Sequence, residues 1–245
     1  MNVAIKTGTE TMTAWEIIPR LKRYQMLPQL IKEAIIDAAI AEINCTTNQT
    51  TQAIEIFYQQ QGLTTPEARQ AWLESRGMNQ EDVTDIATRN LKIEKLKQEK
   101  FGGGLTSYFL QRKGQLDKVV FSIVRVSDMG LAQELYFRLE EGHSFAELAK
   151  TYSQGQEAAA GGIVPPMEMG KLPPAIASAF NSYGTGTILP PFPLGNEYVV
   201  IKIEQKISVQ LDSQVRQRLL NEQFQAWLNK EVQRQGYSIE NLLAS

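Results

Sequence analysis

The hydrophobic period of this chain changes at Lys118, and that change constrains the fold more than any other feature. Before Lys118, apolar residues recur every three to four positions, the spacing of helices with one buried face. After it comes a β-branched run typical of a strand, Val119-Val-Phe-Ser-Ile-Val-Arg-Val126. The helical period returns beyond Asp212. The sequence therefore predicts a unit containing β-strands between two helical segments.

Residues 13–113 are predicted to form helices only. Thr13 with Glu16 is a capping box for the first helix. In Thr65-Pro66-Glu67, the threonine is an N-cap, the proline suits the first turn, and the acidic residue favours the start of a helix. These signals predict an all-α N-terminal domain.

The central unit, residues 115–208, is expected to mix short helices with strands. Ser144 with Glu147 caps a helix of about two turns that ends near Ser153. The pair Gly161-Gly162 then permits close backbone approach or positive φ. Another short helix ends at Phe180, and strands are predicted for residues 187–192 and 198–207.

A long amphipathic helix is predicted from Asp212 to Gly236, within a C-terminal segment of residues 209–245. Its apolar face is too long to be buried on the small central unit. We therefore expect residues 209–235 to complete the N-terminal helical domain, followed by a short helical tail from Ser238. The fold class is α+β, with a β-α-α-α-β-β domain inserted into an all-α domain.

Composition excludes several classes of function. Lys plus Arg number 25 and Asp plus Glu 27, so no basic excess favours nucleic acid. Cys45 is the only cysteine, which rules out an intrachain disulfide, and we expect neither metal nor cofactor. The polar first ten residues and the lack of a long apolar run predict no membrane insertion and a cytoplasmic location.

Residues from Lys118 to Lys206 resemble the parvulin family of peptidyl-prolyl cis-trans isomerases, also called rotamases. The resemblance rests on the first strand, on Gly-His-Ser-Phe-Ala-Glu-Leu-Ala-Lys-Thr-Tyr-Ser (142–153), on Gly161-Gly162, and on the strand Tyr-Val-Val-Ile-Lys-Ile (198–203). The flanks, above all residues 61–83, resemble the helical chaperone parts of parvulin foldases. The resemblance implies a protein-folding isomerase inside a helical chaperone domain.

The resemblance also places the candidate site. The first family histidine falls at Phe121 or Ser122, and the second falls at Tyr198. The only histidine of the chain, His143, is expected in a solvated turn. The implied catalytic residues are Ser122 and Tyr198, and the implied substrate-binding residues are Phe121, Gln154, Val164, Met167, Ala175 and Phe180.

Two functions remain open at this stage. One is an isomerase and foldase that acts on an extended polypeptide or Xaa-Pro peptide, with a precursor peptide for maturation or export as one candidate client. The other is a weakly active or inactive escort that only binds peptide, since both histidines are replaced. A homodimer formed through the long helices is a further option. Tyr198 and Ser122 also have ordinary explanations, as a strand aromatic and a packed serine.

Overall fold

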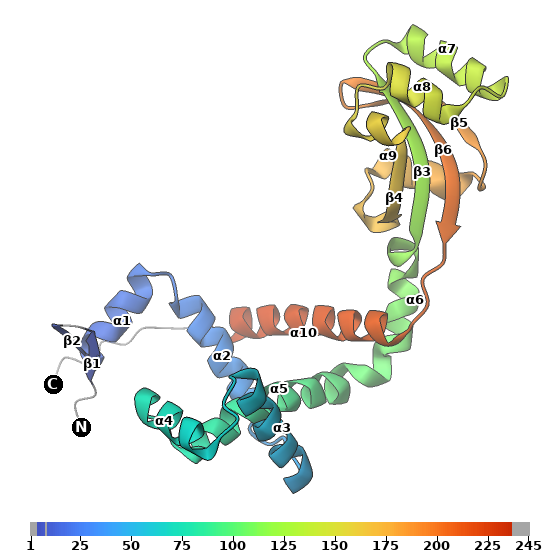
Figure 1. Ribbon diagram of the computed structural model, residues 1–245. Helices are drawn as coiled ribbons and strands as arrows, with labels where there is room; N and C mark the ends of the chain where they lie inside the picture. The colour runs from blue at the N-terminus through green and yellow to red at the C-terminus, as the bar shows by residue number, and fades with distance from the viewer. Residues whose placement is uncertain (1–3, 8, 237–245) are drawn as a thin grey trace. The chain divides into compact units, whose positions relative to one another are not determined.

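The computed structural model describes residues 4–7 and 9–236 (Figure 1). The chain forms two compact units, each described by itself below. We call Met1–Leu105 with Arg216–Ser245 the helical unit, and Thr106–Val215 the sheet unit. The tail predicted from Ser238 lies outside the described residues.

The helical unit begins with a two-stranded antiparallel hairpin that the sequence did not predict, β1 (Ala4–Thr7) and β2 (Glu10–Thr13). Its helices are α1 (Ala14–Arg23), α2 (Leu27–Ile40), α3 (Thr47–Gln60), α4 (Pro66–Arg76), α5 (Gln80–Phe101) and α10 (Ser213–Gln235). A 3₁₀ turn, η1 (Gly102–Gly104), links α5 to α6 (Leu105–Leu116). The capping box of α1 is present, and the backbone N–H of Thr13 donates to Glu16 Oε2 over 2.8 Å.

The core of the helical unit joins α2 and α5 to the distant α10. Buried side chains from all three helices form one cluster, which includes Ile36, Leu96 and Phe224. A polar cluster reinforces it: the buried Lys97 donates to Glu94 Oε1 over 2.6 Å and to Asn221 Oδ1 over 2.7 Å. Lys97 and Asn221 are 124 residues apart in sequence, so α10 closes the unit.

After α6, the sheet unit contains β3 (Lys118–Val126), α7 (Met129–Glu140), α8 (Phe145–Tyr152), β4 (Ile163–Glu168), α9 (Pro174–Ser182), β5 (Ile188–Leu194) and β6 (Glu197–Ile207). Two 3₁₀ turns, η2 (Gln156–Ala160) and η3 (Met169–Lys171), flank β4. The strands form an antiparallel sheet in the order β4-β3-β6-β5, which Figure 1 shows.

Prolines mark both edge strands of this sheet. β4 contains Pro165 and Pro166, and β5 contains Pro190, Pro191 and Pro193. Proline has no N–H to donate and is tolerated at sheet edges. Both edges therefore resist the addition of a further strand.

The two faces of the sheet carry separate cores. On one face, side chains of β3, β6 and β5 pack with α9, and we call this the α9 face. On the other, Val124, Val126 and Val200 pack with α7 and α8, and we call this the α7–α8 face. Neighbouring strand residues point to opposite faces, so Phe121 and Ile123 belong to the α9 face and Ser122 to the other.

The fold class, α+β with the β-containing domain inserted into a helical one, is confirmed, with one correction. β4 was not predicted, so the order is β-α-α-β-α-β-β instead of β-α-α-α-β-β. Its two prolines hide a strand that pairs on one side only. The division between the units falls near residues 105 and 215, whereas the borders predicted from sequence were near 114 and 208.

Gly162 occupies a position where the chain approaches the sheet closely. Its φ is +81°, and a Cβ there would lie 2.6 Å from the carbonyl oxygen of Ile123 and 2.9 Å from Ala149 Cβ. The same segment is fixed by the Ile123 N–H, which donates to the carbonyl of Gly162 over 2.8 Å. The close approach expected from Gly161-Gly162 is confirmed.

Within the part of the chain that the structure describes, no helix combines the length and the apolar composition needed to cross a bilayer.

Candidate functional site

The α9 face has a buried apolar floor and a partly exposed apolar rim. Phe121, Ile123 and Ile201 are buried in the floor, and Ile176 of α9 covers them. Four half-buried side chains of the edge strands surround it and are called the apolar rim: Val164, Met167, Phe192 and Leu194. Such a surface can hold an apolar ring while leaving the adjoining peptide in solvent.

The α9 face ends in a charged cluster that the sequence did not reveal. Arg125 Nε lies 2.7 Å from Glu157 Oε1, and its Nη1 lies 3.6 Å from Glu197 Oε2. The Arg125 N–H and carbonyl also bond Ser153 Oγ and the N–H of Gln154. The alternation of side chains along β3 places Arg125 on the same face as Ile123. It is the one sequence signal that could have indicated this charged cluster.

The two predicted catalytic hydroxyls do not converge. Ser122 of β3 pairs with Lys202 of β6, and Tyr198 of β6 pairs with Val126 of β3. The two pairs are four residues apart along the strands. At about 3.3 Å per residue this separates them by about 13 Å. Ser122 is buried and donates to Glu204 Oε1 over 2.8 Å, while Tyr198 packs against the α7–α8 core.

The predicted substrate-binding residues also do not form one group. Val164 and Met167 lie in the apolar rim, and Phe121 lies beneath it. Phe180 is fully buried and meets Phe121 edge to face, with ring centroids 5.1 Å apart, so it supports the floor from below. Ala175 is exposed, and the next residue, Ile176, points inward.

The structure thus corrects the grouping predicted from sequence. Ser122 and Tyr198 lie on the α7–α8 face, so neither shares a cavity with Val164 and Met167. The cause is the two-residue period of a strand, since a shift of one position moves a side chain to the opposite face. Gln154 is exposed beside the Arg125 cluster, and its Nε2 lies 3.5 Å from Ser127 Oγ.

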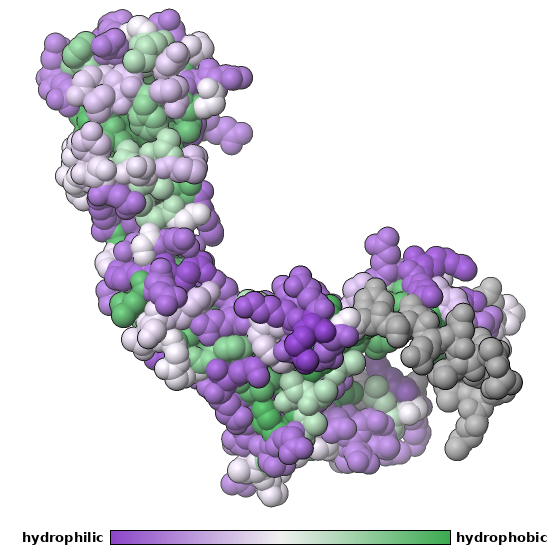
Figure 2. All heavy atoms as spheres, turned by 180° about the vertical axis from the view of Figure 1, so that it is seen from behind, coloured by the Kyte–Doolittle hydropathy of each residue, from purple (hydrophilic) through white to green (hydrophobic). Residues whose placement is uncertain are grey.

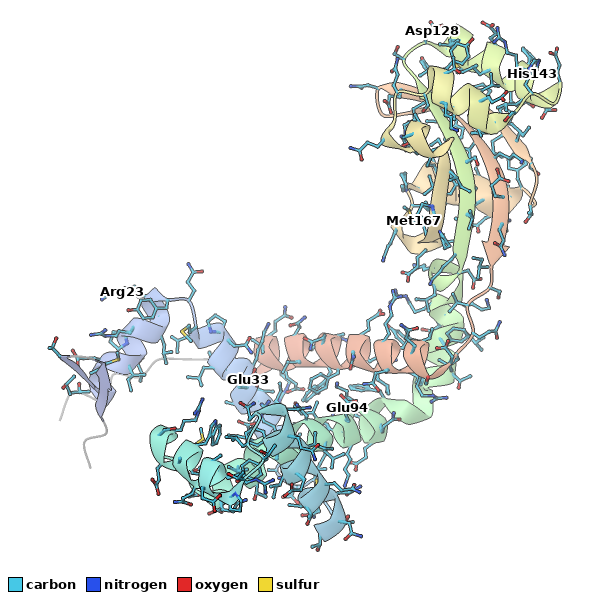
Figure 3. The ribbon with its side chains drawn as sticks, viewed as in Figure 1. Arg23, Glu33, Glu94, Asp128, His143 and Met167 are labelled. Carbon is cyan, nitrogen blue, oxygen red and sulfur yellow. The ribbon has the colours of Figure 1, made fainter. Side chains whose placement is uncertain are left out.

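His143 lies in solvent at the turn between α7 and α8, as expected. Figure 3 shows it at the end of the sheet unit that also carries Asp128, away from Met167. Its backbone N–H donates to the carbonyl of Arg138 over 3.0 Å. The α9 face therefore contains no imidazole.

No group of three or more His, Cys, Asp or Glu side chains among the described residues is arranged to hold a metal ion. The α9 face offers apolar contact, peptide groups and the Arg125 cluster.

Residues 129–205 match the family model described as rotamase, the PPIC-type PPIase domain. The chain carries a parvulin-type domain. The match extends from the start of α7 almost to the end of β6, and β3 precedes it.

Curated relatives extend the similarity beyond the parvulin domain. The chaperone SurA of Cupriavidus pinatubonensis is 26% identical over 193 residues, which are 68% of this chain and 38% of that protein. The chaperone SurA of Cupriavidus metallidurans is 27% identical over 210 residues, 74% of this chain and 42% of that protein. The chain thus spans about two fifths of the length of these relatives.

A solved structure shares the fold. The peptidylprolyl isomerase PrsA from Bacillus cereus superposes with a TM-score of 0.53 at 18% identity, over 98% of this chain and 94% of that one. Its likeness covers the flanking helices as well as the parvulin domain. The arrangement of a parvulin domain within a helical one is therefore a known fold.

Proposed function

We propose that the protein is a foldase that binds extended polypeptide clients and accelerates the cis-trans isomerisation of Xaa-Pro bonds on the α9 face. The observation that carries this proposal is the parvulin match over residues 129–205 together with the apolar rim. The similarity to proteins named as chaperone and peptidylprolyl isomerase supports a polypeptide as the client.

Isomerisation is a rotation about the peptide C–N bond, and no covalent bond breaks. The uncatalysed barrier is about 20 kcal/mol, and each ~1.4 kcal/mol of preferential transition-state binding gives a tenfold acceleration. The twisted amide loses resonance and charge separation, so an apolar surrounding favours it over the planar forms. The floor under Val164 and Phe192 supplies such a surrounding.

Arg125 is the candidate hydrogen-bond donor. A guanidinium has five N–H groups, and the ion pairs with Glu157 and Glu197 leave some of them for the prolyl nitrogen of a client, whose lone pair becomes free to accept when the amide twists. Oriented donors at a site of charge rearrangement are a common source of catalysis. Glu157 and Glu197 would hold the guanidinium in place.

The second candidate function is an escort that binds clients without isomerising them. The absence of an imidazole from the α9 face favours it. Under this alternative the rim and the Arg125 cluster bind peptide equally in the cis, trans and twisted forms. Binding would then leave the rate of isomerisation unchanged.

Isomerisation rates measured by NMR exchange on a panel of Xaa-Pro peptides separate these functions. We expect Phe192→Ala to reduce kcat/KM about tenfold through lost apolar contact, and Arg125→Gln to reduce kcat more than peptide affinity. Tyr198→Phe is the matched control, because Tyr198 lies on the opposite face. A loss confined to Tyr198→Phe would move catalysis to the hydroxyl suggested by the sequence.

Two further expectations belong to this proposal. A cytoplasmic location stays a prediction, which cell fractionation tests. Dimerisation through the long helices also stays a prediction, which sedimentation of the purified chain tests. A precursor peptide for maturation or export remains one candidate client.

A further inference from the structure

The helical unit has a groove between α3 and α5 whose lining carries no charge. Its volume is about 670 Å³. Six lining residues are apolar and five are carboxamides: Ala53, Ile56, Phe57, Ile86, Ala87, Leu91, Gln49, Gln52, Gln60, Gln61 and Asn90. In a chain with 21% charged residues, this lining stands out.

Two neighbouring grooves of the same unit differ in this respect. The lining of a groove of about 760 Å³ includes Glu42, Glu94, Lys95 and Glu99. The lining of another, of about 390 Å³ between α2 and α5, includes Asp37, Asp85, Arg89 and Lys92. The uncharged lining is thus particular to the α3–α5 groove among these three.

The apolar floor of the α3–α5 groove is open to solvent. Ile56 is 53% exposed and Ile86 is 40% exposed. Figure 2 shows apolar surface exposed between hydrophilic side chains on the helical unit. From Gln49 to Gln60 the groove follows α3 for about 16 Å, at about 1.5 Å per residue, which is the length of about five extended residues.

Four of the five carboxamides are free to bind a ligand. Gln49 Oε1 already accepts from Lys95 Nζ over 2.8 Å. The side chains of Gln52, Gln60, Gln61 and Asn90 make no hydrogen bond to another residue of the described ranges 4–7 and 9–236. Each carboxamide offers two N–H donors and one carbonyl acceptor, the same groups that an extended peptide backbone presents.

We propose that the α3–α5 groove binds an uncharged, extended segment of a client polypeptide, about five residues long and without a need for proline. The apolar side chains of the segment would contact Ile56 and Ile86, and its backbone would pair with the carboxamides. An ionic ligand has no counter-charge here. A helix of a second copy has its backbone groups already bonded and would leave the amides unused. The inference rests on the proposed polypeptide client and adds a site separate from the α9 face.

The test uses the full chain and a ten-residue peptide with blocked ends and an uncharged fluorophore. The peptide alternates Val, Ile or Phe with Ser, Thr or Gln, and contains no proline. Asn90→Asp keeps the shape of the side chain and adds one negative charge, and Ile56→Asp removes the exposed floor. Lys92→Gln is the matched control, because it changes the net charge by the same amount on the same helix but in the neighbouring groove.

We expect Asn90→Asp and Ile56→Asp each to weaken binding tenfold or more, while Lys92→Gln changes it less than twofold. Circular dichroism verifies that each variant is folded. Binding equal to wild type in both groove variants overturns the inference, as does a dimer that Ile56→Asp dissociates without a change in peptide affinity. Failure of the proposed isomerase is recognised separately, since wild-type protein would then leave Xaa-Pro exchange at its background rate.

Discussion

The sheet unit and the helical unit are held together in different ways. The sheet unit is one continuous segment, 106–215, in which two cores sandwich a four-stranded sheet. The helical unit depends on α10, which returns after that segment to meet α2 and α5. A continuous unit can fold from local signals, whereas a divided one must wait for its last helix. Stability can therefore be altered in each unit separately.

The largest expected effect comes from ending the chain after Val215. That truncation removes Phe224 and Leu228 from the core of the helical unit and deprives Lys97 of Asn221. The loss of each large core side chain costs about 3–5 kcal/mol, which together approaches the whole stability of a domain. We expect the helical unit to lose its cooperative melt.

Residues 106–215 expressed alone are the counterpart of this truncation. We expect them to give a soluble fragment with its own cooperative thermal transition by circular dichroism. An unfolded fragment, or a truncated chain whose helical unit still melts cooperatively, would contradict the contrast between the two units.

A second prediction concerns the backbone of the sheet unit. Gly162→Val places a Cβ against the Ile123 carbonyl and forces a β-branched residue to positive φ. We expect a loss of about 3 kcal/mol or more in the free energy of unfolding. Chemical denaturation followed by near-UV circular dichroism measures it.

Two controls separate the causes of that loss. Gly77→Ala also sits at positive φ but meets open space, so it should cost only about 1 kcal/mol. His143→Ala removes a solvent-exposed side chain and should stay within about 0.5 kcal/mol. A loss at Gly162 no larger than that at Gly77 would mean that the contact with the sheet is not tight.

Local signals explain how much of the fold could be predicted from sequence. The capping box at Thr13 and the β-branched run of β3 act over a few residues and were both predicted. β4 was missed because Pro165 and Pro166 remove the usual strand pattern, and only pairing with β3 makes the segment extended. The hairpin β1–β2 was missed because the first ten residues are polar.

The candidate site was harder to predict, because it depends on which sheet face each residue occupies. The family resemblance grouped Val164 and Met167, which do share the α9 face, with Ser122 and Tyr198, which lie on the opposite face. A shift of one residue in the alignment moves a side chain to the opposite face. Because this chain lacks the family histidines, the resemblance could not decide that alignment. Arg125 was missed since its partners, Glu157 and Glu197, come from distant segments.

The smallest expected effect tests the polar link that closes the helical unit. Burial tends to raise the pKa of Glu94, but hydrogen bonds from Lys97 and Gln217 and the charge of Lys97 lower it below its ordinary value. A carboxylate with a depressed pKa in the folded state stabilises that state above its unfolded pKa of about 4.3. The contribution disappears as the pH falls through the lower, folded pKa.

Glu94→Gln should therefore cost about 1 kcal/mol in the free energy of unfolding at pH 7, given that the side chain is partly exposed. The difference from wild type should be constant down to about pH 5 and shrink towards zero below about pH 4. Glu99→Gln on the same helix, at an exposed position, is the control and should show no such dependence. Urea titrations of the full chain at several pH values measure both. A difference that persists undiminished at low pH would mean that the ionised carboxylate of Glu94 does not link α5 to α10, and that apolar packing alone closes the helical unit.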